Sequence, residues 1–592
     1  MRRILASIAV GALTCGICIS QQIGDIDTVG TTWYDLQHNG TCGRMICLDS
    51  QCRIHVVWTN GDNIGTRHVY YNAWDPQLGW IWGNVGIPAE STQRGGYTCL
   101  AMDSDDNTYI ALHVITLATA PDAAAACITR SNLYLCPFVY APYRLELIWP
   151  QIAVDINDRI HMINTKNPTG GTGYPQLMFY VGGQYNEGLL EIAWDDSQRV
   201  IDNVRTLSAD ITASRHTDRV AFTYCNMRTH NPETEYNNDI RLIVSEDGIN
   251  WDFNDYINVT QFIPPDLSLL PDTTAANKDT FRTYTDASVL FDIADNIHVA
   301  FTTPFFDSIR GIISINNSLI WHWCDATGYY SLVADGWLEP FPYVCGAWQR
   351  FVQRPCIAED ESTGDLFIVY QQYDTSDIAA NGYPQADIMI SRSIDGGIRW
   401  SIGTNISNTH SPGAEAGYCM HEREITCNET IVNDTLCIFY ILDKDAGSVI
   451  QSEGAWTLNY AICQRVPISE IPTIPLMPRY PMHVDSTGFP PESPVIDIDH
   501  QSAIPKSFQL CQNFPNPFNP TTNISFTICH RDHIKLTIYN ITGQKITTLV
   551  NGSLNPGSYT VNFDANALAS GIYFYKLSSS TEVKTRKMLL IK

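Results

Sequence analysis

A short pattern of apolar and polar positions recurs along residues 21 to 465. In each copy an apolar stretch leads through a tight turn rich in Asp, Asn or Gly into a run of β-branched and aromatic residues, most clearly at 152–162. Such turn residues tolerate unusual dihedrals, and the flanking residues favour a pleated, buried surface, so each copy predicts a β-hairpin. The runs after the turns lie at 53–58, 109–111, 160–162, 220–224, 297–301, 366–370 and 435–440.

Repetition of all-β units every 50 to 80 residues or so predicts a β-propeller. Seven copies favour seven blades, and six remains an alternative because the gaps between copies vary from about 52 to 79 residues and the copy at 218–224 is weak. We expect the run after each turn to be the innermost strand of its blade. A further apolar run follows each of these, ending with Val449-Ile450 in the last unit.

Two of these later runs lead into a turn of defined composition. Ser393, Asp395, Gly397 and Trp400 fit the pattern S-x-D-x-G-x-x-W, and Ser245, Asp247, Gly248 and Trp251 repeat it one residue shorter. Ser and Asp can bond turn amides, Gly supplies an unusual dihedral, and Trp packs the hairpin onto the sheet. The chain thus resembles the Asp-box (BNR-repeat) β-propellers, a superfamily that includes sialidases. In that family the box is structural and lies outside the catalytic site.

Residues 466–506 are rich in proline and predict an extended linker. Alternating strands at 507–592 predict a small antiparallel sandwich. This module resembles the type A C-terminal sorting domain of the type IX secretion system, which is related to the FlgD Ig-like fold. The positions that carry the resemblance are Asn516, Pro517, Gly543, Gly571, Tyr573, Lys587 and Lys592. The resemblance implies the secretion machinery as a partner, and a secreted or surface location on a Gram-negative-type bacterium, reached through the periplasm.

The N-terminus supports export. Arg2 and Arg3 precede an apolar run and small residues up to Ser20, a pattern typical of a cleaved signal peptide over residues 1–20. No later segment is apolar for long enough to form a membrane helix, so we expect no membrane insertion after cleavage. The formal charge of −26 argues against nucleic acid and anionic membranes as partners.

The candidate metal ligands have simpler explanations. His55, His161 and His298 follow Ile at equivalent places in different units, which favours packing between blades over a metal site. Asp103, Asp105 and Asp106, like Asp155, Asn157 and Asp158, lack the Gly and distant Glu of a calcium loop and are interpreted as turn residues. Sixteen cysteines follow the signal peptide without zinc-ligand spacing. We expect no metal and no cofactor; disulfides remain an open alternative.

A ligand site is expected at the mouth of the propeller, ahead of the innermost strands. The candidate ligand-binding residues there are Arg44, Tyr97, Trp149, Arg282, Tyr284, Arg354, Glu422 and Arg423. Arginine and aromatic side chains are suited to an acidic sugar. No catalytic set can be assigned, so the favoured hypothesis is an exported propeller that binds a glycan or an extracellular protein. The alternative is a sialidase-like glycoside hydrolase or lyase, which should place two carboxylates about 5 to 10 Å apart at the mouth.

Overall fold

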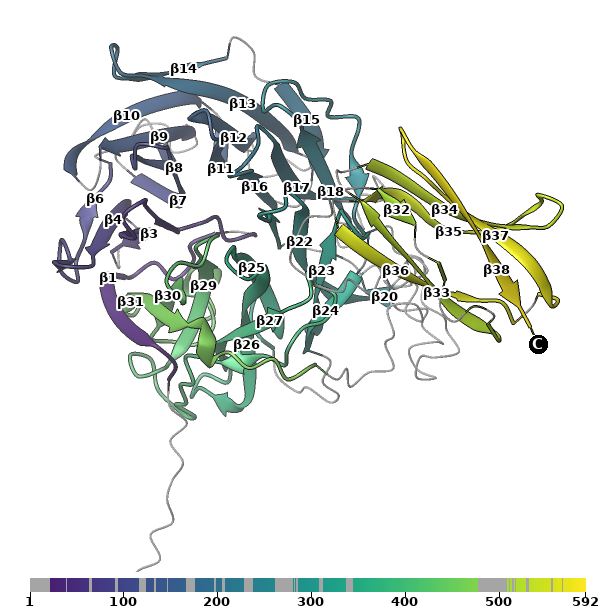
Figure 1. Ribbon diagram of the computed structural model, residues 1–592. Helices are drawn as coiled ribbons and strands as arrows, with labels where there is room; N and C mark the ends of the chain where they lie inside the picture. The colour runs from purple at the N-terminus through teal and green to yellow at the C-terminus, as the bar shows by residue number, and fades with distance from the viewer. Residues whose placement is uncertain are drawn as a thin grey trace, which may run out of the picture.

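The computed structural model describes residues 22–476 and 508–591 apart from gaps, the longest of which are 116–123, 167–175, 228–237, 261–279, 308–311 and 337–343. The predicted signal peptide and most of the predicted linker lie outside the described residues. The fold is all-β, as predicted: seven antiparallel sheets form a propeller, and two further sheets form the C-terminal sandwich (Figure 1). None of the helices among the described residues is long and apolar enough to cross a membrane.

We number the propeller sheets as blades one to seven. Blade one comprises β2 (Ile46–Leu48), β3 (Ile54–Gly61), β4 (Arg67–Asp75), β5 (Gly79–Trp80) and β6 (Ile87–Pro88). Blade two comprises β7 (Arg94–Met102), β8 (Thr108–Ile115), β9 (Ala124–Asn132) and β10 (Leu135–Leu145). Blade three comprises β11 (Leu147–Val154), β12 (Arg159–Lys166), β13 (Gln176–Asn186), β14 (Glu191–Trp194) and β15 (Arg199–Val204).

Blade four comprises β16 (Ala209–Ala213), β17 (Val220–Met227), β18 (Asn238–Ser245) and β19 (Ile257–Asn258). Blade five comprises β20 (Thr280–Phe281), β21 (Ala287–Phe291), β22 (Ile297–Asp307), β23 (Ile312–Cys324) and β24 (Tyr330–Gly336). Blade six comprises β25 (Val352–Asp360), β26 (Asp365–Ile378), β27 (Pro384–Ser393) and β28 (Thr404–Asn405). Blade seven comprises β29 (His421–Cys427), β30 (Thr435–Asp443), β31 (Asn459–Pro467) and the first strand of the chain, β1 (Asp25–Thr32).

The innermost strands are not the ones that the pattern predicted. A closed ring of contacts joins β2, β7, β11, β16, β21, β25 and β29, and each of these strands precedes its turn. The apolar run after the turn is the second strand of its blade, so the expectation of an innermost position was wrong. Both strands are buried on both faces, as in β25 and β26, and hydrophobicity therefore cannot rank them by distance from the axis.

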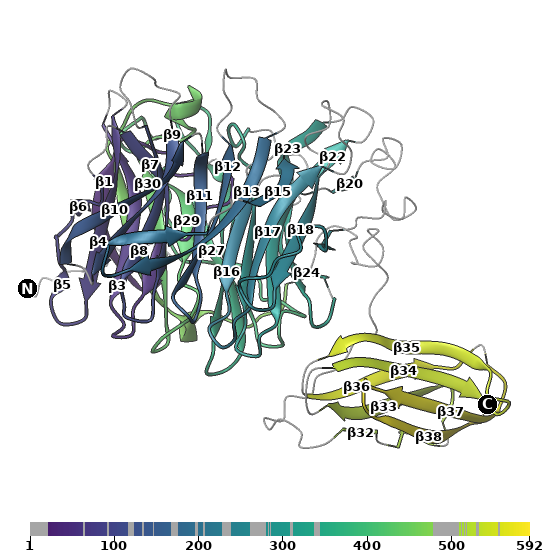
Figure 2. The ribbon, with the colours of Figure 1, turned by 90° about the horizontal axis from the view of Figure 1, so that it is seen from above.

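The recurrent turns lie on one face of the ring, which we call the turn face; the opposite face, where the innermost strands begin, is the mouth face. Figure 2 shows the ring from its side, with the blade strands running between the two faces. On the turn face each blade is linked to the next by turn residues. Ser50 donates its backbone N–H and its hydroxyl to Asp106, at 2.8 and 2.6 Å, and Ser104 does the same to Asp158, at 2.7 and 2.9 Å. The Asp residues of these turns are therefore structural.

The repeated histidines stabilise the same turns. Nε2 of His161 lies 3.1 Å from Asp155 Oδ2 and its Nδ1 lies 2.8 Å from the hydroxyl of Tyr180 on the third strand. His55 bonds Asp49 and Tyr71 in the same way, and His298 bonds Asp292 and His322. His161 also packs against Trp251 of blade four, with ring centroids 6.4 Å apart.

The two turns of Asp-box composition form the predicted hydrogen bonds. Asp395 accepts from Ser393 at 2.9 Å and from the backbone N–H of Arg399 at 2.8 Å, and Gly397 N–H donates to the Ser393 hydroxyl at 2.9 Å. Trp400 is buried and donates its indole N–H to Ser331 of blade five at 2.9 Å. Asp247 accepts equivalent bonds from Ser245 and from the N–H groups of residues 249 and 250.

The last propeller unit departs from the predicted strand order. Val449-Ile450 forms the 3₁₀ helix η2 (Val449–Gln451), and the strand that follows β30 is β31. Glu453 N–H closes back onto Ser448 O at 2.9 Å, which holds this segment in a turn. After β31 and a second 3₁₀ helix, η3 (Ile468–Glu470), the chain returns to blade six, where Leu476 N–H donates to Trp400 O at 2.9 Å.

The C-terminal module is the predicted antiparallel sandwich. One sheet has the order β32 (Gln509–Leu510), β33 (Thr521–Ile528), β36 (Gly557–Asp564); the other has β35 (Lys545–Leu554), β34 (Asp532–Asn540), β37 (Gly571–Ser578), β38 (Val583–Leu590). Its own core includes Ile524, Leu536, Tyr575 and Met588, all fully buried. The last strand is integral, because Met588 and Leu590 belong to this core and Ile591 N–H bonds Phe518 O at 3.0 Å.

Candidate functional site

The loop between β1 and β2 crosses the mouth face and contacts blades all round the axis. Thr41 bonds Ser208 of blade four at 2.9 Å and accepts from Ala287 N–H of blade five at 3.2 Å. Its His38 lies with Nε2 2.9 Å from Thr98 O of blade two. A Cβ on Gly43 would lie 2.5 Å from the Gln151 side chain of blade three, so only glycine fits there. This axial loop (33–45) fills the central end of the mouth.

Four innermost strands carry an irregularity at the same level beneath this loop. The β-sheet register shifts at 96–99, 148–151, 353–356 and 423–426, and each shift contains a non-glycine residue with positive φ: Tyr97, Trp149, Arg354 and Glu424. Such a bulge re-aims a side chain, and its backbone is strained for a residue with a Cβ. The four positions form two neighbouring pairs, in blades two and three and in blades six and seven.

The second pair is an ion pair beside the axial loop. Arg354 Nη1 lies 2.8 Å from Glu424 Oε2 and 3.0 Å from Cys42 Sγ, and Glu424 also accepts from His38 N–H at 3.0 Å. His38, Cys42 and Glu424 bring potential ligand atoms within 4.8 Å of one another. The Arg354 guanidinium already supplies a positive charge to this group, so it does not fit a metal ion. Burial lowers the pKa of His38 to about 4, which leaves it neutral.

The first pair belongs to a group of polar and aromatic side chains that we call the arginine site: Tyr34, Arg67, Arg94, Tyr97, His113 and Trp149. Arg67 donates to the Tyr34 hydroxyl at 2.6 Å and lies 3.1 Å from His113 Nε2. Its guanidinium carbon is 4.5 Å from the centre of the Tyr97 ring, which stacks on His113 at 4.8 Å. The Tyr34 and Tyr97 hydroxyls are 3.0 Å apart.

The arginine site has an unbalanced positive charge. Burial and the neighbouring Arg67 lower the pKa of Arg94, so the two guanidinium groups repel each other. No ion pair to a carboxylate is found for either arginine among the described residues, and there the Nε atoms of both and the indole N–H of Trp149 lack a hydrogen-bond partner. Burial and then Arg67 lower the pKa of His113 well below its usual value, so this histidine is neutral. Unpaired buried donors beside cations are suited to an anion.

Of the predicted ligand-binding residues, the structure brings Tyr97 and Trp149 together in the arginine site, whereas Arg354 and Arg423 both lie against Glu424. Arg44 lies in the interior, where it bonds Ile357 O and Cys427 O and pairs with Glu429 at 2.9 Å. Arg423 is fully buried between Asp35 and Asp443, at 3.1 and 3.2 Å. Arg354 is held by Glu424, as described above. Arg282 and Tyr284 lie outside the described residues.

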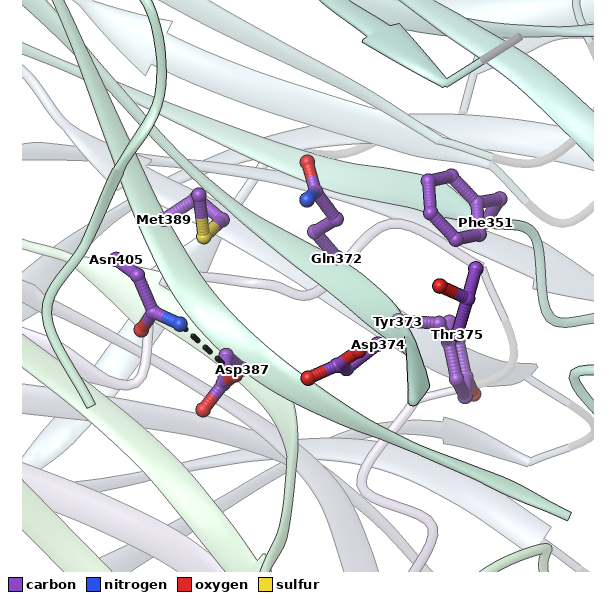
Figure 3. A pocket seen from close by; sticks show the side chains of 8 residues that line it. All are labelled: Phe351, Gln372, Tyr373, Asp374, Thr375, Asp387, Met389 and Asn405. Carbon is purple, nitrogen blue, oxygen red and sulfur yellow. Dashed lines mark hydrogen bonds between the residues drawn. The ribbon is translucent and has the colours of Figure 1, made fainter. Parts of the chain in front are cut away.

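Glu422 lies near a second feature of the mouth face, a pocket of about 320 Å³ on blade six (Figure 3). Phe351, Gln372, Asp374 and Asp387 are among its lining residues, and Asn405 donates to Asp387 at 2.8 Å. The Thr409 hydroxyl lies 3.1 Å from Glu422 and 3.3 Å from Asp387. Burial and then Asp387 raise the pKa of Glu422 well above its usual value. We call this feature the acidic pocket; Tyr373, Thr375 and Met389 complete its lining.

Sequence reasoning missed Tyr34, Arg67, Arg94 and His113. Arg67 begins the third strand of its blade, whereas His113 lies near the end of a second strand. Neither position stands ahead of an innermost strand, where the ligand-binding residues were expected. Arg94 begins the innermost strand β7, three residues before the candidate Tyr97, so its position in the sequence could have identified it.

Solved structures with a similar fold include several enzymes and one secretion component. The chain is similar to a PL25 polysaccharide lyase, an ulvan lyase (11% identity, TM-score 0.42, 72% of this chain and 97% of that chain). It is similar to the sialidase of Trypanosoma rangeli (8% identity, TM-score 0.35, 86% of each chain). It is also similar to PorZ, a surface component of the type-IX secretion system of Porphyromonas gingivalis (10% identity, TM-score 0.33, 94% of this chain and 60% of that chain). These likenesses concern the fold alone.

The comparison with curated proteins gives no significant match. A family model does match the C-terminal module: residues 512–592 fit the secretion system C-terminal sorting domain. This match confirms that the module is a type IX secretion C-terminal sorting domain, and it implies interaction with the type IX secretion machinery. The protein is thus exported to the cell surface or beyond, and its C-terminal module is a member of the secretion system C-terminal sorting domain family.

Proposed function

We propose that the exported propeller binds an acidic glycan through the arginine site on its mouth face. The observation that supports this most directly is the pair of guanidinium groups, Arg67 and Arg94, without a carboxylate partner among the described residues. A sugar carboxylate or sulfate would take the charge-assisted hydrogen bonds that these arginines leave open. Tyr97 and the partly exposed Trp149 supply aromatic surface beside them.

The axial loop explains why such a site would lie off the axis. Residues of this loop bond blades two, four and five, so the centre of the mouth is occupied. Its own Tyr34 reaches the arginine site and bonds Arg67. A ligand would therefore approach over blades one to three. Bacterial surfaces and extracellular matrices are places where an exported propeller meets such polymers.

The test is direct binding by the mature exported protein, measured by titration calorimetry with a polyuronate, a neutral glucan and polyglutamate. We expect binding of the polyuronate alone, weakened at least tenfold in both Arg67→Ala and Arg94→Ala. Arg130→Ala is the matched control, because Arg130 also stacks on a tyrosine but pairs with Asp103 and Glu187. Equal binding of polyglutamate, or loss of binding in the control alone, would contradict the proposal.

A second candidate is β-elimination at a uronate in the same site. Neutral His113 stacks on Tyr97 next to two arginines that could neutralise a carboxylate, and its Nε2 would accept a proton once Arg67 turns from it to the substrate. Hydrolysis is less well supported there, because the described residues of the arginine site include no carboxylate pair. Ultraviolet absorbance of an unsaturated uronate product, lost in Tyr97→Phe and in His113→Gln while binding persists, would distinguish a lyase from a binding protein.

A further inference from the structure

The innermost strands of blades six and seven place two buried cysteines against each other. Cys356 lies on β25 and Cys427 on β29, and both belong to the same core cluster. Cys427 N–H donates to Cys356 Sγ at 3.3 Å, and Cys427 Sγ lies 3.7 Å from Cys356 O. Each thiol therefore reaches the backbone of the other residue, so the two side chains face each other across adjacent strands, where both are free thiols in this structure.

The surroundings of the pair also favour its chemistry. Arg44 Nη1 lies 3.6 Å from Cys356 Sγ, and a nearby guanidinium stabilises a thiolate. A hydrogen bond from the Cys427 thiol, partly offset by burial, lowers the pKa of Cys356 to about 6. Cys356 is thus the stronger nucleophile of the two, and Cys427 is placed to resolve a mixed disulfide formed on it.

We infer that Cys356 and Cys427 form a disulfide that joins blades six and seven in the exported protein. The Cys356 thiolate attacks the disulfide of a periplasmic thiol–disulfide oxidoreductase and releases one thiol of that enzyme. Cys427 then loses its proton, attacks Cys356 Sγ and releases the second thiol, so two protein thiols become one disulfide and the oxidoreductase is reduced. Both sulfur atoms are buried in the finished ring, so this exchange takes place while the two blades are packing together, when Arg44 and Cys427 approach Cys356 but the thiols are still accessible.

The disulfide would connect the innermost strands of blades six and seven, which are neighbours in the ring. The strands are already joined by bonds from Glu359 N–H to Glu429 O, at 2.9 Å, and from Ile431 N–H to Glu359 O, at 2.8 Å. A covalent link between residues 71 positions apart restricts the unfolded chain, and it stabilises the folded ring mainly through that restriction. Reduction should therefore lower the melting temperature without opening the arginine site, which lies over blades one to three.

Mass spectrometry of the exported protein tests the inference. The protein is alkylated under denaturing conditions without reductant and then digested. We expect a peptide pair linked through Cys356 and Cys427, which separates after reduction. Recovery of both cysteines fully alkylated, or of either one linked to Cys42, would overturn the inference.

Thermal unfolding gives an independent readout. A reductant should lower the Tm of the wild-type protein by roughly 5 °C. The double variant Cys356→Ser/Cys427→Ser should unfold at the reduced value and be insensitive to the reductant. Cys225→Ala, at another buried cysteine, is the control and should keep the full reductant effect. An equal reductant effect in the double variant would contradict the inference, even if that variant is less stable overall.

Discussion

Tyr97 and Trp149 occupy the same left-handed bulge position in neighbouring innermost strands, and their rings meet edge to face with centroids 6.3 Å apart. Arg354 and Glu424 occupy that position in blades six and seven, where they form an ion pair. Strained backbone of this kind persists where surrounding contacts impose it, and it is concentrated at functional sites. The same positive-φ bulge therefore places side chains at the mouth in two parts of the ring: an aromatic pair in blades two and three, and a charged pair in blades six and seven.

Loss of one partner from the charged pair should destabilise the propeller strongly. Arg354→Met leaves the fully buried Glu424 with Arg423, whose Nε lies 3.9 Å from Oε1, as its remaining counter-charge, so we expect a loss of about 3 kcal/mol in the free energy of unfolding. The double variant Arg354→Met/Glu424→Gln removes both charges and should be more stable than the single variant. Urea denaturation measures both. A double variant as unstable as the sum of its singles would show that the two residues act independently.

The networks of His55 and His161 predict a dependence of stability on pH. Burial lowers the pKa values of His55 and His161 in the folded protein below their unfolded values. As the pH falls below about 6.5 the unfolded chain takes up protons first, so stability decreases by up to about 1.4 kcal/mol per pH unit for each histidine. Above that pH these two groups have no effect.

Asp49 extends this dependence to lower pH. Burial alone would raise its pKa, but hydrogen bonds from His55 and Arg53 outweigh burial and lower the pKa to about 2. The contribution of Asp49 to stability is present above the unfolded pKa of about 3.8 and is lost as the pH falls towards 2.

Urea midpoints between pH 8 and 4 should fall less steeply in His161→Asn than in the wild type. Parallel curves for the two proteins would contradict the role assigned to His161.

Substitution within the turn of blade six should affect stability alone. Asp395→Ala removes the acceptor for Ser393 and for the backbone of Arg399, and we expect a loss of about 1 to 3 kcal/mol. Affinity for the polyuronate should stay unchanged, because this turn follows β27 at the turn face, away from the mouth. Thermal melting and calorimetry on one protein sample separate the two effects. An unchanged Tm with reduced affinity would place the turn in the binding site.

Removal of the sorting domain should separate export from folding. Deletion of residues 507–592 should leave a folded propeller that accumulates in the periplasm, because the sandwich has its own core. Deletion of residues 587–592 should have nearly the same effect, since it removes Met588 and Leu590 from that core. Cell fractionation with immunoblotting measures the location. Undiminished delivery of either truncated protein to the surface or medium would contradict the sorting role.

The fold was predictable because its signals are local. A turn such as 155–159 and the strands beside it are consecutive in sequence, so the pattern of apolar and turn residues predicts the hairpin directly. The distance of each strand from the propeller axis could not be predicted, since the first and second strands of a blade are equally buried. The same holds at the blade-seven turn, where Val449 and Ile450 have strand propensity but Glu453 holds a 3₁₀ turn.

The candidate site was less predictable because it is assembled from separate elements. Tyr97 and Trp149 were found since each lies at the start of an innermost strand. His113 was missed because a histidine near the end of a second strand has no local signature of function. Arg44 and Arg423 were expected at the mouth because they stand ahead of predicted strands, yet buried acceptors such as Cys427 O and Asp443 hold them in the interior.

The seam of blade seven imposes an order of events on biogenesis. β1 is the first strand of the chain to be synthesised, but its partner β31 ends at Pro467, more than four hundred residues later. The ring can therefore close only when the strand β31 of the final blade has been synthesised. The sorting domain follows this closing strand in the sequence. The sorting signal is thus synthesised only after all the strands that the propeller needs to close, so the order of the sequence provides a completeness check on the propeller.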